Sequence, residues 1–140
     1  MLPGNHDPLE LINALPEIYK DTKNIHGYAV KHKNVGVFGA GSADIGLFVL
    51  EDDKLFNVLE KGFKYVKDMD KKIMVTHMHP SNTKAEFSGF PGNKAIRRAI
   101  ERFKPDIFIC SHVHEAEGIE EKIGKTRVIN VGRRGSVIEV

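Results

Sequence analysis

Residues 107–114 read IFICSHVH, a short apolar run followed at once by two histidines. Residues 73–80, IMVTHMHP, repeat the arrangement, since a β-type apolar run again delivers two histidines at its end. Runs of this length suit buried strands better than helices. Because loops at the carboxyl ends of strands direct polar groups into a common crevice, the two stretches predict an α/β fold in which these histidines meet.

Helical patterns flank the two predicted strands. Between them, NKAIRRAIERF at 93–103 has helical spacing and follows a polar loop. Upstream, the acidic residues 51–53 favour the positive end of a helix that continues to residue 66. Its buried face is predicted to consist of Leu55, Phe56, Leu59, Phe63 and Val66.

The N-terminal part of the chain predicts a helix followed by a hairpin. Asp7 is expected to cap a helix in which Pro8 takes the first turn and Pro16 ends the pattern. The runs HGYAVKH (26–32) and VGVFGAG (35–41) are separated by two polar residues and predict two antiparallel strands.

The C-terminal part predicts more strands. Residues 117–124, 126–132 and 136–140 alternate in polarity and turn at glycines, which favours antiparallel strands. No repeat or linker interrupts the chain, so residues 1–140 are expected to form a single domain.

Composition limits the classes of function. The 140 residues are 41% hydrophobic and 29% charged with a net charge of +2, the profile of a globular protein without a strong basic patch. Nucleic acid is therefore not indicated as a partner, except as a substrate. Cys110 is the only cysteine, which excludes an intrachain disulfide, and no apolar run approaches the ~20 residues of a membrane span. We expect a cytoplasmic protein that is not embedded in a membrane.

Five side chains at predicted strand ends are candidate ligands. They are Asn5, His77, His79, His112 and His114. Imidazole is the commonest nitrogen ligand of first-row metals, and an amide oxygen completes a mixed sphere suited to Mn, Fe, Zn or Ni. In a His-x-His pair on an extended segment both rings leave the same side, so His112 and His114 are expected to serve one metal or two neighbouring ones.

Three ordered blocks carry a resemblance to a known family. PGNHD at 3–7, THMHP at 76–80 and CSHVH at 110–114 together resemble the blocks of the calcineurin-like metallophosphoesterases, with Ser111 where that family usually has glycine. The resemblance implies a layered α-β-β-α sandwich that hydrolyses a phosphomonoester or phosphodiester.

The resemblance also implies roles for individual residues. Asn5, His77 and His112 would bind the second of two divalent metals, and His114 would bind the first. Manganese is expected, with iron, nickel or zinc as alternatives. The two metals, roughly 3.5–4 Å apart, would activate a bridging water, and His6 would protonate the leaving group. His79 is interpreted as a contact to the substrate phosphate or as a capped loop residue.

Two blocks of the family are missing from these residues. An Asp-x-His pair and a Gly-Asp-x-x-Asp block precede GNHD in that family, and neither occurs here. The chain is therefore expected to be the C-terminal portion of a phosphoesterase, N-terminally truncated, with one weak metal at best and little or no activity. An exposed sheet edge would then favour a homo-oligomer.

Other readings are weighed against this one. A binding module that keeps the fold and one metal without hydrolysis is the main alternative, and an unrelated metal hydrolase is rejected because SNTK at 81–84 lacks the residues it needs. Residues 39–46, GAGSADIG, resemble the variable substrate-side loop of the phosphoesterases. His26 and His32 are expected to face solvent. Surface solvation is favoured over phosphate binding for the arginines at 97, 98, 102, 133 and 134.

Overall fold

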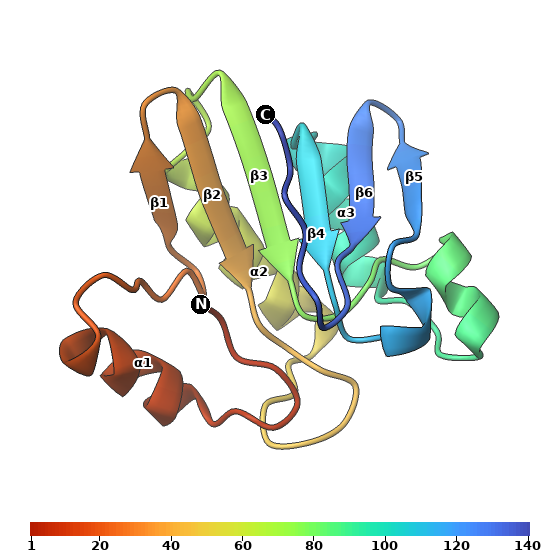
Figure 1. The fold of residues 1–140 in the computed structure, drawn as a ribbon, viewed down its shortest axis with the longest axis horizontal. Helices are drawn as coiled ribbons and strands as arrows, with labels where there is room; N and C mark the ends of the chain where they lie inside the picture. The colour runs from red at the N-terminus through yellow and green to blue at the C-terminus, as the bar shows by residue number, and fades with distance from the viewer.

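The computed structural model describes residues 1–140 as one six-stranded sheet with the order β1-β2-β3-β4-β6-β5 (Figure 1). The four inner strands are parallel to one another, and each outer strand is antiparallel to its neighbour. The strands are β1 (Ala29–His32), β2 (Val35–Ala40), β3 (Lys71–Thr76), β4 (Ile107–Cys110), β5 (Glu120–Ile123) and β6 (Thr126–Asn130). Because these strands are parallel, the carboxyl ends of β2, β3, β4 and β6 lie at the same end of the sheet.

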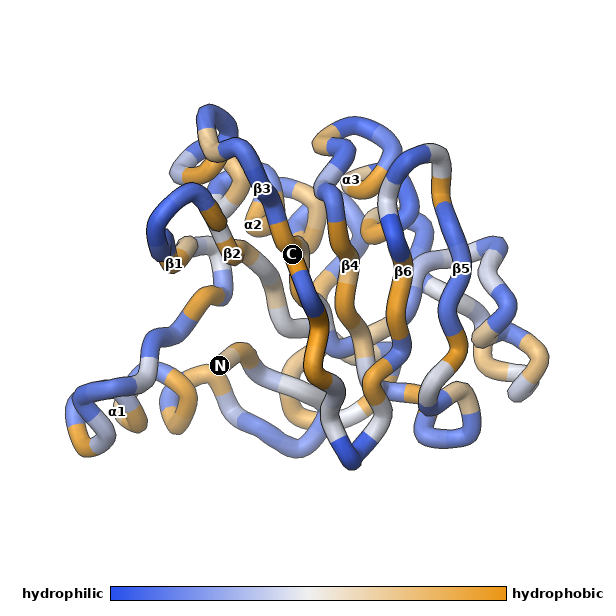
Figure 2. The backbone as a smooth tube through the Cα atoms, turned by 45° about the horizontal axis from the view of Figure 1, so that its top comes forward, coloured by the Kyte–Doolittle hydropathy of each residue, from blue (hydrophilic) through white to orange (hydrophobic).

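Helices α2 (Asp52–Lys64) and α3 (Lys94–Phe103) cover one face of the sheet. The strands alternate, so Phe38, Met74 and Phe108 point to this face and are fully buried beneath the helices. Asn93 caps α3 by accepting a hydrogen bond from the backbone N–H of Ile96 at 2.9 Å. Figure 2 shows the matching pattern, with apolar stretches along β4 and β6.

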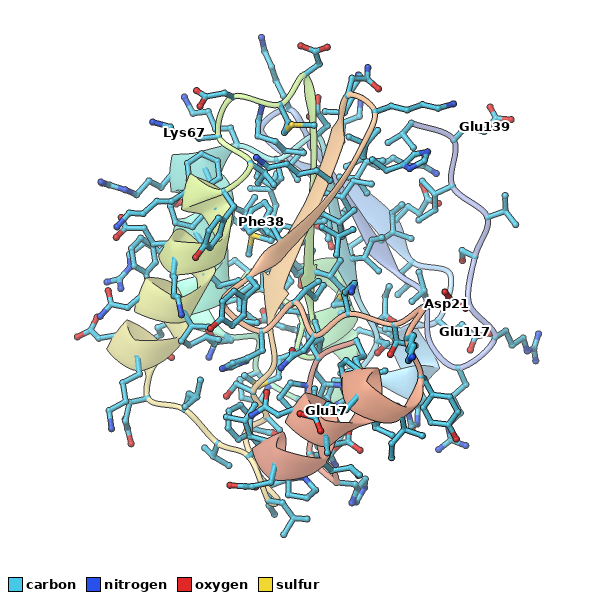
Figure 3. The ribbon with its side chains drawn as sticks, turned by 90° about the vertical axis from the view of Figure 1, so that its left-hand side faces the viewer. Glu17, Asp21, Phe38, Lys67, Glu117 and Glu139 are labelled. Atoms are coloured by element: carbon cyan, nitrogen blue, oxygen red, sulfur yellow. The ribbon has the colours of Figure 1, made fainter.

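The opposite face of the sheet carries no helix. Figure 3 shows α2 on the side of Phe38 and the C-terminal segment with Glu139 on the other side. Val37, Ile73, Val75 and Ile109 point to this face and remain partly exposed. The α/β class is confirmed, and of the four layers of the implied sandwich this chain forms one sheet and the helices on one of its faces.

Helix α1 (Leu9–Ile18) differs from the expectation at both ends. Pro8 is the N-cap residue and no side chain caps the helix, because the Asp7 carboxylate instead accepts a hydrogen bond from the Gly4 N–H at 3.0 Å. The helix also continues through Pro16, since the Tyr19 N–H still bonds to the Leu15 carbonyl at 2.8 Å. None of the helices is both long and apolar enough to cross a lipid bilayer.

The strand expected at residues 136–140 is absent. The segment has the alternation of a strand but pairs with neither of the outer strands, β1 and β5. It lies over the face that has no helix, with Val137 fully exposed (Figure 1). The hairpin β1–β2, helices α2 and α3, and strands β3 to β6 form as predicted.

Candidate metal centre

An open cleft of about 730 Å³ lies beyond the carboxyl ends of β3 and β4. Its lining includes five of the six residues singled out in the sequence: Asn5, His6, His77, His112 and His114. His77 follows β3 directly, and His112 and His114 follow β4. The predicted convergence of the three blocks at one edge of the sheet is therefore present.

Backbone contacts bring the ends of β3 and β4 together. The N–H groups of Ser111 and His112 both donate to the His77 carbonyl, at 3.1 and 3.0 Å. This double contact extends the strand pairing by two residues and brings the side chains of His77 and His112 next to each other. Their rings meet edge to face with centroids 4.7 Å apart.

Three donor atoms from the three blocks converge. His77 Nε2 lies 3.0 Å from Asn5 Oδ1 and 2.9 Å from His112 Nδ1. Two ligands at right angles, each about 2.1 Å from a metal ion, are separated by about 3.0 Å. These two separations thus fit neighbouring ligands in the first coordination sphere of one divalent transition metal.

One consistent set of protons accounts for the contacts in this group. Asn5 Nδ2 donates to His6 Nε2 at 3.2 Å, so Asn5 Oδ1 accepts from His77 Nε2–H. His112 Nε2 faces the Asp44 carboxylate at 3.2 Å and therefore carries the ring proton. The lone pairs of Asn5 Oδ1 and His112 Nδ1 consequently point toward the His77 proton, at the position where a cation would replace it.

The electrostatics of the group suit ligation by neutral imidazole. Burial, and next to it the neighbouring His112, lower the pKa of His77 to about 4. No three His, Cys, Asp or Glu side chains converge on a common point, so the amide oxygen of Asn5 is needed as the third donor. Such a mixed nitrogen and oxygen set accepts Mn, Fe, Ni or Zn.

The loop 41–47 holds Asn5 in place. The Leu47 N–H donates to the Asn5 carbonyl at 2.9 Å. Gly46 has a φ of +113° and packs directly on that carbonyl, and Gly41 packs on the Pro3 carbonyl, so a Cβ atom at either glycine would collide with the backbone. This glycine-rich loop therefore holds the Asn5 loop in place. That is a structural role in addition to the substrate-side position that its resemblance implies.

Asp44 is a site residue that the sequence analysis missed. It lies in the same glycine-rich loop, lines the cleft and contacts His112. The only sequence signal was an acidic residue within GAGSADIG, and an acidic loop residue is most often solvated. Its pairing with His112 depends on the tertiary contact between two loops that are far apart in the chain.

His6 and His114 lie in the cleft but outside the converging group. His6 is exposed and contacts Asn5. The ring of His114 meets Arg133, whose Nε–H donates to His114 Nε2 at 3.4 Å. Arg133 lines the cleft, so surface solvation alone does not describe this arginine.

His79 lies apart from the cleft. Its side chain is 2% exposed, it is not among the lining residues, and neither ring nitrogen makes a hydrogen bond. Burial lowers the pKa of its ring. In this conformation the ring does not line the cleft, so a contact to a molecule bound there would need a movement of the loop around it, and with no hydrogen bond the ring does not cap that loop either.

Two other expectations have clear outcomes. Cys110 is a small buried core residue as expected, and burial raises the pKa of its thiol to about 12. His32 is exposed as expected, but His26 is half-buried and accepts a hydrogen bond from the Gly41 N–H at 3.0 Å. The expectation for His26 was wrong because the segment before β1 turns back along β2 instead of extending into solvent.

Comparison with known proteins identifies the family and the fold. The model of the calcineurin-like phosphoesterase family matches residues 1–116. The crystal structure of TT1561 of Thermus thermophilus has a TM-score of 0.70 and 17% identity, covering 94% of this chain and 61% of that chain. A second crystal structure has the same TM-score and identity and covers 94% of this chain and 56% of its own. No curated protein matches.

These structures share the fold and are longer than this chain, which spans 61% and 56% of their lengths. The family match is independent of them and extends over most of the 140 residues. It includes every histidine of the cleft. The chain therefore belongs to the calcineurin-like phosphoesterase family.

Proposed function

We propose that this chain carries the second-metal half of a phosphoester hydrolase active site. Asn5, His77 and His112 would hold one divalent metal ion, preferably manganese, with iron, nickel or zinc as alternatives. The approach of Asn5 Oδ1 and His112 Nδ1 to within 3.0 Å of His77 Nε2 is the observation that carries the proposal. When bound, such an ion supplies Lewis-acid activation of a water and charge stabilisation for a phosphoryl group.

The residues of the chain have distinct tasks in this proposal. His6 lies at the exposed side of Asn5, where its ring would protonate the leaving oxygen of a phosphomonoester or phosphodiester. His114 would be a ligand of a first metal. For His79 a contact to the substrate stays a prediction, and it requires the loop around its buried ring to open.

The proposal limits the activity of these residues alone. No Asp-x-His or Gly-Asp-x-x-Asp block occurs among the 140 residues, so only His114 remains for the first metal. We therefore propose one weakly bound metal and slow or absent hydrolysis for the chain alone. A cytoplasmic location and a homo-oligomer formed through the sheet edge remain part of the proposal, and nucleic acid enters it only as a substrate.

One observation favours the second candidate function, a metal-binding or partner-binding module without hydrolysis. The lone pair of His114 Nε2 accepts from Arg133, so the remaining ligand of the first metal is already engaged. A single metal without its neighbour would bind a phosphoester and leave the attacking water poorly activated. Turnover after the acidic ligands are supplied therefore separates the two functions, and metal binding by the chain alone does not.

The first experiment measures metal content per chain and hydrolysis of p-nitrophenyl phosphate and its bis-ester after addition of Mn²⁺. We expect one metal and slow turnover that vanishes in His112→Ala. Two metals with fast turnover would contradict the proposed limit and would mean that a second chain supplies ligands. One metal without turnover fits both the proposed limit and the binding module, which the second experiment then separates, and no metal would refute both functions.

A second experiment adds the missing ligands. An N-terminal segment with an Asp-x-His pair and a Gly-Asp-x-x-Asp block would be fused before Met1, and a matched fusion would carry alanine at the acidic ligands. We expect the intact fusion to bind two metals and to gain at least about 100-fold in turnover, because each metal stabilises transition-state charge. Equal behaviour of the two fusions would contradict the proposal.

A further inference from the structure

We infer that Asp44 is a positioning residue that fixes the ring of His112 for metal binding, an inference that rests on the proposed metal centre. Asp44 Oδ1 lies 3.2 Å from His112 Nε2, on the opposite side of the ring from the Nδ1 that meets His77 at 2.9 Å. Carboxylates on the outer nitrogen of a metal-binding imidazole fix its tautomer and raise its basicity.

The backbone around Asp44 holds the carboxylate at this distance. The Ala43 N–H bonds to the Phe48 carbonyl at 3.0 Å, and the Ser42 hydroxyl accepts from the Leu50 N–H at 2.9 Å. Asp44 has no other ion-pair partner, so nothing competes with His112 for its carboxylate. The loop that fixes Asn5 thus also carries the group that orients His112.

Loss of Asp44 would reverse the polarity of the His112 ring. Without an acceptor at Nε2, the ring proton is free to move to Nδ1 and to point at His77 and Asn5. An N–H group directed at the donor cluster opposes a cation there. We therefore expect Asp44→Ala to weaken the first equivalent of Mn²⁺ by about 10- to 100-fold, the usual cost of removing such a partner.

The test combines two readouts on the whole chain. Ring ¹⁵N NMR of the metal-free protein reports the His112 tautomer, with its signals assigned from a His112→Gln sample, and calorimetry measures Mn²⁺ affinity. We expect the Nε2–H tautomer in the unmodified protein, a mixture in Asp44→Ala, and a smaller change in Asp44→Asn, whose amide oxygen still accepts. Asp53→Ala, which removes a surface carboxylate paired with Arg98, is the matched charge control.

Each outcome decides the inference. An unchanged tautomer in Asp44→Ala overturns it, even when Mn²⁺ affinity falls, because the carboxylate would then act through its charge or as a direct ligand. A changed tautomer with unchanged affinity also overturns it. If the unmodified protein binds no Mn²⁺ but the tautomer still depends on Asp44, the metal centre fails while the hydrogen-bond role stands.

A second inference comes from the other end of the cleft. We propose that Arg133 binds the phosphoryl oxygens of the substrate, which deepens the proposed function by naming its anion-binding residue. Arg133 lines the cleft and contacts His114 there. The Glu117 carboxylate does not pair with the Arg133 guanidinium but accepts from the Arg133 backbone N–H at 2.9 Å and pairs with the Arg134 guanidinium at 3.3 Å.

The other arginines lack this combination. Four of them form ion pairs with carboxylates: Arg97, Arg98, Arg127 and Arg134. Arg102 is outside the cleft. Arg133 is therefore the one guanidinium that faces the cleft without a carboxylate partner, and a planar guanidinium binds phosphate oxygens through two parallel hydrogen bonds.

The test measures binding of inorganic phosphate by calorimetry, together with Mn²⁺ affinity and ester hydrolysis. We expect Arg133→Ala to weaken phosphate at least about 10-fold, Arg133→Lys to weaken it less, and Arg134→Ala to change it by less than about twofold. Mn²⁺ affinity is expected to stay the same in all three.

The outcomes separate this inference from the proposed function. Phosphate affinity unchanged in Arg133→Ala, in a protein that hydrolyses esters, overturns the role of Arg133 and leaves the function intact. Absence of Mn²⁺ binding and turnover, with phosphate affinity that still depends on Arg133, refutes the function and leaves an anion site. An unmodified protein that binds no phosphate overturns the inference.

Discussion

The cleft has two halves that use the same residue type differently. In the half formed by Asn5, His77 and His112, here called the paired half, the donor atoms of Asn5 and His112 each lie within 3.0 Å of His77 Nε2. In the half formed by His114, here called the single half, Arg133 is the only side chain that contacts a ring nitrogen. The two histidines that follow β4 therefore have unlike surroundings although they are two residues apart.

The difference shows that convergence, and not the number of histidines, determines where a metal fits. His112 joins the paired half because its backbone N–H bonds to the His77 carbonyl. His114 begins the short 3₁₀ helix His114–Ala116, which directs it toward the loop after β6. Each half thus has its own cation. In the paired half it is the proposed metal ion, and in the single half it is the Arg133 guanidinium.

The largest effect is expected from a substitution that removes the central ligand of the paired half. His77→Ala removes the nitrogen that both other donors approach, so we expect the affinity for the first equivalent of Mn²⁺ to fall at least about 100-fold, more than loss of an outer partner costs. His114→Ala is expected to change that affinity by less than about threefold. Calorimetric titration of both variants measures the contrast.

A matched control separates ligand loss from unfolding. His32→Ala removes an exposed histidine of β1 and should leave both Mn²⁺ affinity and the thermal midpoint unchanged. Equal losses in His77→Ala and His114→Ala would show that the two halves form one site, and the comparison would no longer hold.

Acid provides a smaller test of the paired half. The pKa of His77 is about 4 in the folded chain, mainly through burial, and about 6.5 when unfolded. Between these values the unfolded chain binds a proton that the folded chain does not, so the free energy of unfolding is fully retained above pH 6.5 and falls as the pH drops toward 4. Urea unfolding of the metal-free protein at pH 7, 6 and 5 measures this decline.

Substitution identifies the group responsible for that decline. His77→Gln keeps a polar side chain that does not titrate, so its unfolding free energy should depend less on pH. His26, whose pKa is also lowered by burial, contributes in the same direction and remains in this variant. Identical pH profiles for His77→Gln and the unmodified chain would rule out the assigned role of His77.

The smallest expected effect concerns the single half. Glu117 binds the backbone of Arg133 and the side chain of Arg134. Glu117→Gln weakens both contacts and loosens the loop, so phosphate affinity should fall about threefold, the range of one exposed ion pair, without a change in Mn²⁺ affinity. Calorimetry with phosphate and with Mn²⁺ distinguishes this result from a loss of the whole cleft.

Much of this arrangement could be predicted from sequence because its signals are local. Strands β3 and β4 are short apolar runs, and their histidines follow directly, so the edge of the sheet that carries the cleft follows from the pattern. Helix α3 has a strong helical period and an asparagine cap. The three blocks gave Asn5, His6, His77, His112 and His114 as cleft residues, all of which line it.

The remaining features depend on contacts that no local pattern encodes. Asp44 and Arg133 come from loops, and each matters only because of the histidine against which the fold packs it. The segment 136–140 has a strand pattern but finds no partner, since pairing depends on which sheet edge is free. His79 has the same local context as His77, yet its ring is buried and does not line the cleft.

The packing of the glycine-rich loop has a consequence for how this protein tolerates variation. Gly41 and Gly46 pack on the backbone on either side of Gly4 and carry no side chain that could ligate a metal or move a proton. A survey of all single substitutions would nevertheless rank them with the histidines of the cleft, because any side chain there would push Asn5 away from His77. Intolerance to substitution in this loop would therefore measure the shape of the backbone and not its chemistry.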